Sequence, residues 1–173
     1  MRARGMAWGV LVVLLAAGGA DALWAQKKDY LSEVEADKIR DAGTPSERIK
    51  LFVTFAAERL RKLQYELERP SAERRRGELL NSLLNSYTGC LDDAIELVQL
   101  GVEKQSDIRK GLEEIQKKAP EFLKYLQGLA ENGPEREKYQ SNFEDAIEAT
   151  QDAIKDTEKA VKEYAPPPVR RKQ

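Results

Sequence analysis

The sequence predicts an all-α protein: an up-down-up-down four-helix bundle preceded by a short N-terminal helix and a cleavable signal peptide. Three observations support this fold class. Four segments after residue 44 carry apolar residues at alternating intervals of three and four, the periodicity of an amphipathic helix. None of these segments alternates as a half-buried strand does. The first residues have the layout of a secretory leader.

Residues 1–25 form the predicted signal peptide. Arg2 and Arg4 provide a positive start, and an apolar stretch and several small residues follow. Cleavage after Ala22 or after Ala25 fits the small-residue rule, and the sequence does not choose between them. The uncharged stretch is shorter than the roughly 20 residues that span a bilayer, so we expect cleavage and no stable membrane span afterwards. The expected location is periplasmic or extracellular.

Residues 26–44 are predicted to be a short capped helix and a linker. Ser32 and Glu35 have the spacing of a capping box, in which each side chain bonds the other residue's backbone amide. We expect this helix to end at about Ala42, with Gly43 in a left-handed cap.

Residues 45–164 form the predicted helical bundle. Thr44, Pro45 and Glu47 combine an N-cap, a proline at the first helical position and a capping box, which indicates a helix start. Pro70 ends this first long helix, because the residue before a proline resists helical angles.

The second long helix is expected from Ala72, capped by Ser71, to about Leu100, with a break at Gly101. Ser106 is expected to cap the third.

The apolar periodicity of the third helix continues across Pro120, which predicts one bent helix, and a break there is the alternative. The fourth helix follows a turn at 132–134 and ends before three consecutive prolines. Residues 165–173 form the predicted Pro-rich basic tail.

Large apolar residues on the four stripes are the expected core anchors. Truncating any of them to alanine should cost roughly 2 to 5 kcal/mol. They are Phe52, Leu63, Leu84, Leu91, Phe122 and Phe143.

The absence of histidine narrows the possible chemistry. The 173 residues contain no histidine and one cysteine, so they cannot form a Ser-His-Asp site, a Cys-His site or a histidine-ligated metal or haem. We therefore predict that the protein is not an enzyme and has no catalytic, cofactor-binding or metal-binding residues. Cys90, on a helical apolar pattern, is expected to be a buried small residue, and an intermolecular disulfide is the alternative.

Charge argues against a nucleic-acid partner. The leader contributes Arg2, Arg4 and Asp21 to the 29 basic and 30 acidic residues, which leaves the remainder with a net charge of −2. General nucleic-acid binders usually have a large basic excess.

Two groups of carboxylates lie on predicted helix faces. We interpret them as solvated faces that meet lysines and arginines of adjacent helices, and a calcium site is the alternative. The larger group is Asp145, Glu148, Asp152 and Asp156, and the smaller is Asp92, Asp93 and Glu96.

Three further polar features each have two interpretations. A polar line on the second long helix is either a boundary row at a helix interface or the wall of a groove. The two basic clusters are either balanced by neighbouring acidic residues and solvent, or bind an anionic partner. The line is Asn81, Asn85, Thr88 and Asp92, and the clusters are Arg74-Arg75-Arg76 and Arg170-Arg171-Lys172.

These observations predict an exported, non-catalytic helical bundle that acts as an envelope binding, adaptor or scaffold protein. Its partner would be another protein or an envelope component. The alternative is an extracytoplasmic carrier or sensor that holds a small apolar ligand or a cation within the bundle. The sequence leaves the oligomeric state open.

Overall fold

A computed structural model describes residues 30–69 and 74–164 of the chain. The predicted signal peptide (1–25) and the predicted basic tail (165–173) lie outside these residues. Within them the protein is all-helical, and no strand occurs. The helices are α1 (Glu33–Asp41), α2 (Pro45–Leu67), α3 (Arg76–Glu103), α4 (Arg109–Asn132), a short 3₁₀ turn η2 (Arg136–Lys138) and α5 (Gln140–Glu163).

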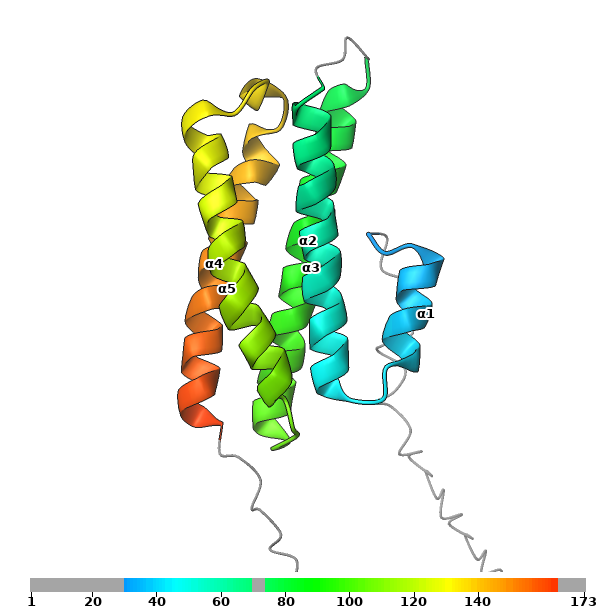
Figure 1. Cartoon of the computed structure of the whole chain (residues 1–173), viewed down its shortest axis with the longest axis vertical. Helices are drawn as coiled ribbons and strands as arrows, with labels where there is room; N and C mark the ends of the chain where they lie inside the picture. The colour runs from blue at the N-terminus through cyan, green and yellow to red at the C-terminus, as the bar shows by residue number, and fades with distance from the viewer. Residues whose placement is uncertain (1–29, 70–73, 165–173) are drawn as a thin grey trace, which may run out of the picture.

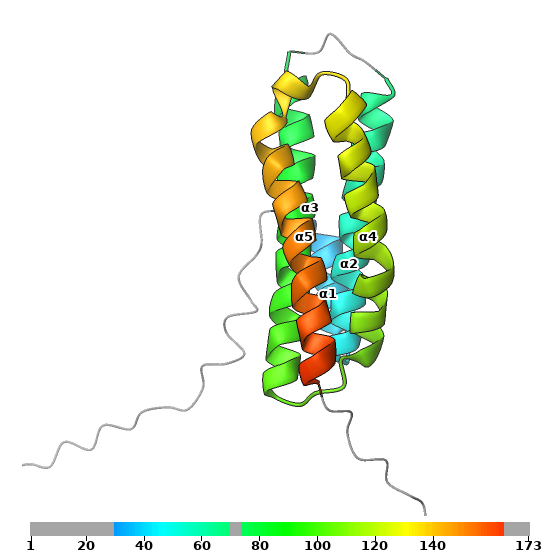
Figure 2. The same cartoon turned by 90° about the vertical axis from the view of Figure 1, so that its left-hand side faces the viewer.

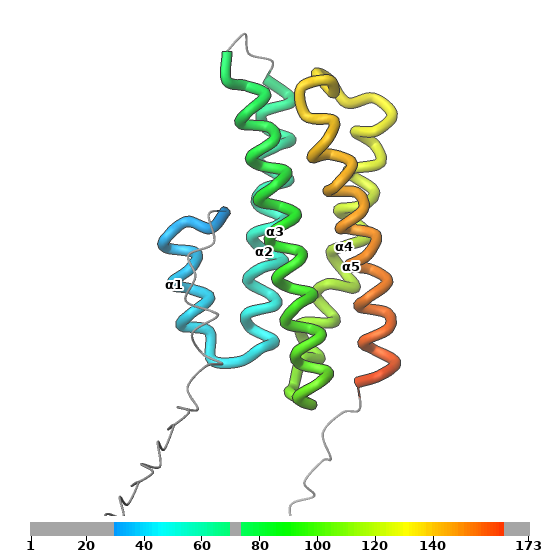
Figure 3. The backbone as a smooth tube through the Cα atoms, turned by 180° about the vertical axis from the view of Figure 1, so that it is seen from behind, coloured from blue at the N-terminus to red at the C-terminus, as the bar shows by residue number. Residues whose placement is uncertain are grey.

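The four long helices lie side by side, and successive ones run in opposite directions (Figures 1 and 2). α2 packs against α3 and α4, and α5 packs against the same two helices. The face between α3 and α5 is therefore opposite the face between α2 and α4. α1 lies outside this group, alongside one half of α2 (Figures 1 and 3).

The interior is formed by the predicted apolar stripes. All six expected anchors, namely Phe52, Leu63, Leu84, Leu91, Phe122 and Phe143, are buried, which confirms the expectation. Cys90 is buried as well, as expected of a small apolar side chain. The Tyr87 ring meets Phe122 edge-on, with ring centroids 5.8 Å apart.

One polar pair is enclosed in this interior. The Thr150 hydroxyl donates to the carbonyl of Ala146 at 2.6 Å, so it accepts from the Tyr87 hydroxyl, also at 2.6 Å. This bond satisfies both buried hydroxyls between α3 and α5, and an unpaired hydroxyl there would be costly.

Both predicted capping boxes are confirmed, at Ser32–Glu35 and at Thr44–Glu47. The left-handed cap predicted at Gly43 is wrong, since no described glycine has a positive φ. Instead the Gly43 amide donates to Glu47 Oε2 at 2.9 Å, so the residue belongs to the start of α2.

The start of α3 differs from its prediction. The helix begins at Arg76 and not at Ala72, and the predicted cap Ser71 lies outside the described residues. Three arginines in a first turn would oppose the helix dipole. The later start leaves only Arg76 inside the helix, where its charge is paired.

The predicted break at Gly101 is also wrong, because α3 continues to Glu103. A Cβ on Gly101 would lie 2.3 Å from Ile108 Cγ2, so this glycine lets the next connection pack closely. The helix ends where Gln105 takes a left-handed φ of 50°. The amides of Gln105 and Ser106 then bond the carbonyls of Val102 and Gly101, which is the Schellman pattern.

The predicted cap at Ser106 is wrong too. α4 begins after Ile108 without a side-chain cap, although Asp107 Oδ1 accepts the Arg109 amide at 3.3 Å. The predicted continuity across Pro120 is confirmed, since α4 runs unbroken through it.

Candidate functional site

A groove runs between α3 and α5 along about half of each helix. Its two parts have volumes of about 200 and 260 Å³ and share Gln99 and Asp156, so they form one continuous depression. We call it the acidic groove. Its charged lining residues are Asp92, Glu96, Glu103, Asp152, Asp156, Lys159 and Glu163.

Small residues on α5 create the depression. Ala149, Ala153 and Ala160 face the groove from α5, while Ile95, Val98 and Val102 face it from α3, so that the floor is apolar. Because a methyl group fills little space, the two backbones leave a furrow along their line of contact. The walls are long, charged side chains that rise on either side.

The walls are strongly negative. Six carboxylates line the acidic groove, against one lysine, Lys159. Asp152 also receives a bond of 2.9 Å from the exposed Lys155, and this hydrogen bond raises the pKa of that lysine. The described residues contain no group of three or more His, Cys, Asp or Glu side chains placed to hold a metal ion. The carboxylates are therefore spread along the groove and do not converge on one point.

The groove combines parts of both predicted carboxylate groups. Asp92 and Glu96 from α3 face Asp152 and Asp156 from α5. The third acid of the smaller group, Asp93, is buried on another side of α3. The remaining members, Asp145 and Glu148, are exposed on α5 outside the groove lining.

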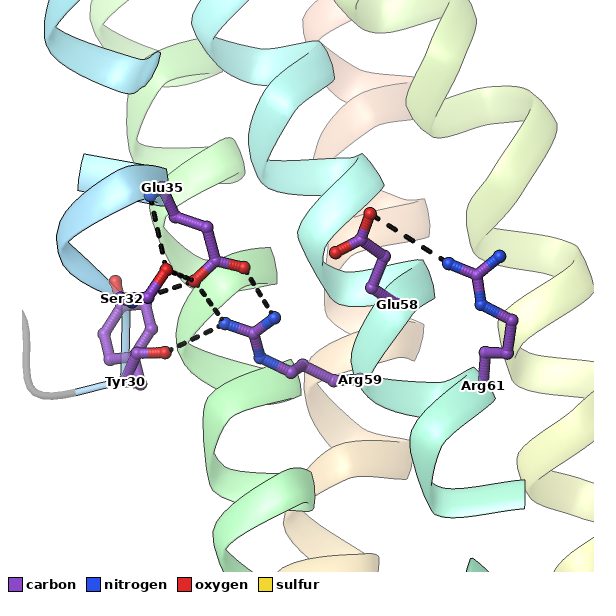
Figure 4. A network of polar contacts seen from close by, with 6 residues as sticks. All are labelled: Tyr30, Ser32, Glu35, Glu58, Arg59 and Arg61. Carbon is purple, nitrogen blue, oxygen red and sulfur yellow. Dashed lines mark hydrogen bonds and ion pairs between the residues drawn. The ribbon is translucent and has the colours of Figure 1, made fainter. Parts of the chain in front are cut away.

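The opposite face has a groove of similar size and different charge. Between α2 and α4 a depression of about 310 Å³ is lined by Glu58, Arg61, Glu114 and Lys118 around a small apolar floor. Two acids and two bases balance there. Glu58 and Arg61 approach to 4.0 Å on the outer surface of α2 (Figure 4). Of these two grooves, the one between α3 and α5 has the strong net charge.

The face between α2 and α3 is covered by α1. The Arg59 guanidinium, 8% exposed, binds both carboxylate oxygens of Glu35 at 2.7 Å (Figure 4). Its Nη2 also donates to the carbonyl of Tyr30 at 3.2 Å. Glu35 Oε2 accepts from the amide and the hydroxyl of Ser32, each at 2.8 Å. The hydrogen bonds from Arg59 hold the pKa of Glu35 down at about 2.

Tyr30 attaches the same segment to α3. Its hydroxyl donates to Asp93 Oδ2, and burial together with this bond raises the pKa of the tyrosine. The ring lies on Gly89, where an added Cβ would come within 2.8 Å of ring carbons. Sequence reasoning missed Tyr30 and Arg59, because their partners are 63 and 24 residues away along the chain.

Arg76 joins three segments at the end of the molecule where α2 ends. Its guanidinium bonds the Glu66 carbonyl, the Glu66 carboxylate at 3.4 Å and the Glu135 carboxylate. The expectation that nearby acids balance this arginine is confirmed for Glu66. Glu135, in a left-handed conformation before η2, is a partner that the sequence did not indicate.

The predicted polar line on α3 divides between its two interpretations. Asn81 donates to the carbonyl of Lys138 at 2.7 Å, as a boundary residue would. Asp92 is part of a groove wall. Asn85 is exposed, and the buried hydroxyl of Thr88 has no hydrogen-bond partner among the described residues.

Comparisons with family models, with curated proteins and with solved structures found no match to this chain. None of the helices in the described part of the chain combines the length and the apolar character needed to cross a bilayer. The acidic groove is therefore the feature of the molecule that bears most directly on function. That groove presents exposed carboxylates along an apolar floor.

Proposed function

We propose that this protein is an exported, non-catalytic binding protein of the extracytoplasmic space, and that its acidic groove binds a basic segment of a partner polypeptide. The proposal includes an up-down-up-down four-helix bundle as the rigid scaffold. The alternating directions of successive long helices support that order (Figure 2). Their contacts place α3 beside α5 and α2 beside α4, so these two neighbouring pairs run parallel. The leader at the start of the sequence supports export.

The observation on which this function depends is the charge of one groove. Six carboxylates against one lysine attract a cationic ligand from a distance and orient it along the helices. The apolar floor of alanine and valine side chains accommodates the methylene stems of lysine and arginine. A basic segment with its charges on both edges would thus meet both walls at once.

The alternative, a carrier for a small apolar ligand or a cation, has less support. The space between the helices is occupied by packed side chains such as Tyr87, Phe122 and Leu84. The carboxylates of the groove are distributed along its length, whereas calcium takes six to eight oxygens around one point.

The test is the affinity of the purified protein for fluorescein-labelled hexa-arginine, measured by anisotropy at low salt. The groove variant E96Q/D156N/E163Q should weaken binding about tenfold, since each lost surface pair contributes roughly 0.5 kcal/mol. The control variant E113Q/E131Q/E144Q changes the net charge equally at exposed sites on α4 and α5 outside the groove.

The control should leave the affinity within about twofold. Raising the salt to 0.5 M should abolish most of the difference, because surface charges are then screened. Equal weakening in both triple variants would show that net charge, and not the groove, attracts the peptide, and would refute the proposal.

A further inference from the structure

We propose that the chain's own C-terminal segment, Arg170-Arg171-Lys172, occupies the acidic groove and competes with the basic partner. The inference rests on the proposed function, because it assigns a regulator to the same groove. The segment and the groove have opposite charge. Three basic residues lie within 165–173, and the groove presents six carboxylates.

The position of the groove relative to the chain end supports an intramolecular contact. One end of the groove is lined by Glu163, the last residue of α5, and by Glu103, the last residue of α3. The described chain stops at Tyr164, the next residue. The segment therefore leaves α5 at the mouth of the groove.

The length of the segment is sufficient for this contact. Asp156 lies eight residues before Tyr164, which is about 12 Å along the helix. Arg170 lies six residues after Tyr164 and can reach about 20 Å when the chain is extended. A chain that turns back after α5 thus brings Arg170 and its neighbours past Glu163 to Asp156.

The other basic cluster of the sequence is a poorer candidate. Arg76 is 2% exposed and already bonds Glu66 and Glu135, and Arg75 pairs with Glu78 at 2.8 Å. These residues lie at the start of α3, whereas the groove lies along its second half.

The expected strength of competition follows from tethering. The tether holds the segment near the groove, so docking does not require a second molecule to associate. Three exposed ion pairs, each contributing about a factor of two, favour the docked form by up to about tenfold. The segment would then weaken the binding of a competing peptide between about two- and tenfold.

The experiment compares three forms of the full chain in the hexa-arginine titration at low salt. R170Q/R171Q/K172Q should bind the peptide two- to tenfold more tightly than the unmodified protein. The control K62Q/K117Q/K124Q makes the same change in net charge at exposed residues of α2 and α4, and it should leave the affinity nearly unchanged.

The outcomes distinguish a failure of this inference from a failure of the proposed function. If both triple variants shift the affinity equally, or neither shifts it, the segment does not occupy the groove, while the proposed function stands. If no form binds hexa-arginine, the proposed function fails and this inference fails with it. A shift that grows with protein concentration would assign the segment to the groove of a second copy and would overturn the intramolecular form.

Cross-linking with a zero-length carbodiimide is an independent test of the contact between the segment and the groove. Lys172 is the only lysine in residues 165–173, so an amide between it and a groove carboxylate identifies the contact directly. We expect monomeric protein to yield peptides that link Lys172 to Asp156 or Glu163. Links to Glu113 or Glu131 of α4 at equal frequency would contradict the proposal.

Discussion

Asp92 and Asp93 are neighbours in the sequence, and α3 places them on two surfaces with opposite properties. Asp93 is buried beneath Tyr30, on the face that α1 covers. Asp92 is exposed in the wall of the acidic groove. On the first face each carboxylate is matched by specific donors, whereas on the second the carboxylates outnumber the cations. The difference teaches that one helix can place the same residue type on a covered face and on an exposed one, with different surroundings at each.

The largest effect is expected from Arg59→Met, which removes the cation beneath α1. It would leave the Glu35 carboxylate, 11% exposed, without its guanidinium partner. Breaking such a buried pair lowers the free energy of unfolding by about 3 kcal/mol. The loss cannot exceed the free energy that is needed to detach α1 from the bundle. Urea denaturation, together with amide exchange of residues 33–41, measures the loss.

The matched control for that variant is Arg61→Met on the same helix. Arg61 is 75% exposed and pairs with Glu58 at 4.0 Å on the balanced face. Exposed pairs of this kind contribute less than about 1 kcal/mol. Similar losses of unfolding free energy in the two variants would show that the Arg59 pair beneath α1 contributes no more than an exposed pair.

Acid should weaken the attachment of α1 to the bundle, because it protonates Glu35. Its pKa is about 2 in the folded protein and 4.5 without these contacts, so the unfolded chain binds the proton first as the pH falls. The stabilisation is complete above pH 4.5 and is lost as the pH falls from there through 2. The difference between these two pKa values corresponds to about 3 kcal/mol.

The variant E35Q should remove this dependence. The difference in unfolding free energy between the unmodified protein and E35Q should shrink steadily between pH 5 and pH 2. A difference that stays constant over that range would contradict the assignment of the low pKa to the contact with Arg59.

Much of the fold followed from the sequence, because apolar periodicity and capping boxes are local signals. The anchors Phe52 and Phe143, the Ser32–Glu35 box and the continuity through Pro120 all depend on residues within a few turns. The predictions from sequence were wrong where contacts between residues far apart in the chain determine the local structure.

Gly101 looked like a helix break and proved to be a close contact with Ile108. The end of α3 used Gln105 in a conformation that glycine usually adopts. No local signal could have indicated either outcome.

The site was predicted only in part, for a similar reason. The spacing of Asp152 and Asp156 placed them on one face of a helix, and the same held for Asp92 and Glu96. Their meeting across one groove requires that α3 and α5 be neighbours, which helix periodicity alone does not specify. The pairing of Glu35 with Arg59 likewise depends on where α1 packs.

The smallest effect is expected from a pair of glycine substitutions, and its sign is informative. Gly89→Ala would place a Cβ within 2.8 Å of the Tyr30 ring, so the ring must move and the contact with Asp93 weakens. We expect a net loss of about 1 kcal/mol. Gly128→Ala meets nothing within 4 Å and should gain up to about 1 kcal/mol from helix propensity. Thermal unfolding of the two variants compares them, and a gain at both positions would mean that Tyr30 does not rest on α3.

The most direct test of the central claim is carboxylate footprinting with a carbodiimide and glycine amide, read by peptide mass spectrometry. Glu96 and Asp156 should react quickly, and hexa-arginine should protect them. Glu35 and Asp93 should react slowly with or without the peptide, and Glu113 should react quickly without protection. Fast reaction of Asp93, or equal protection of Glu113 and Glu96, would contradict the division between a closed face and an open acidic groove.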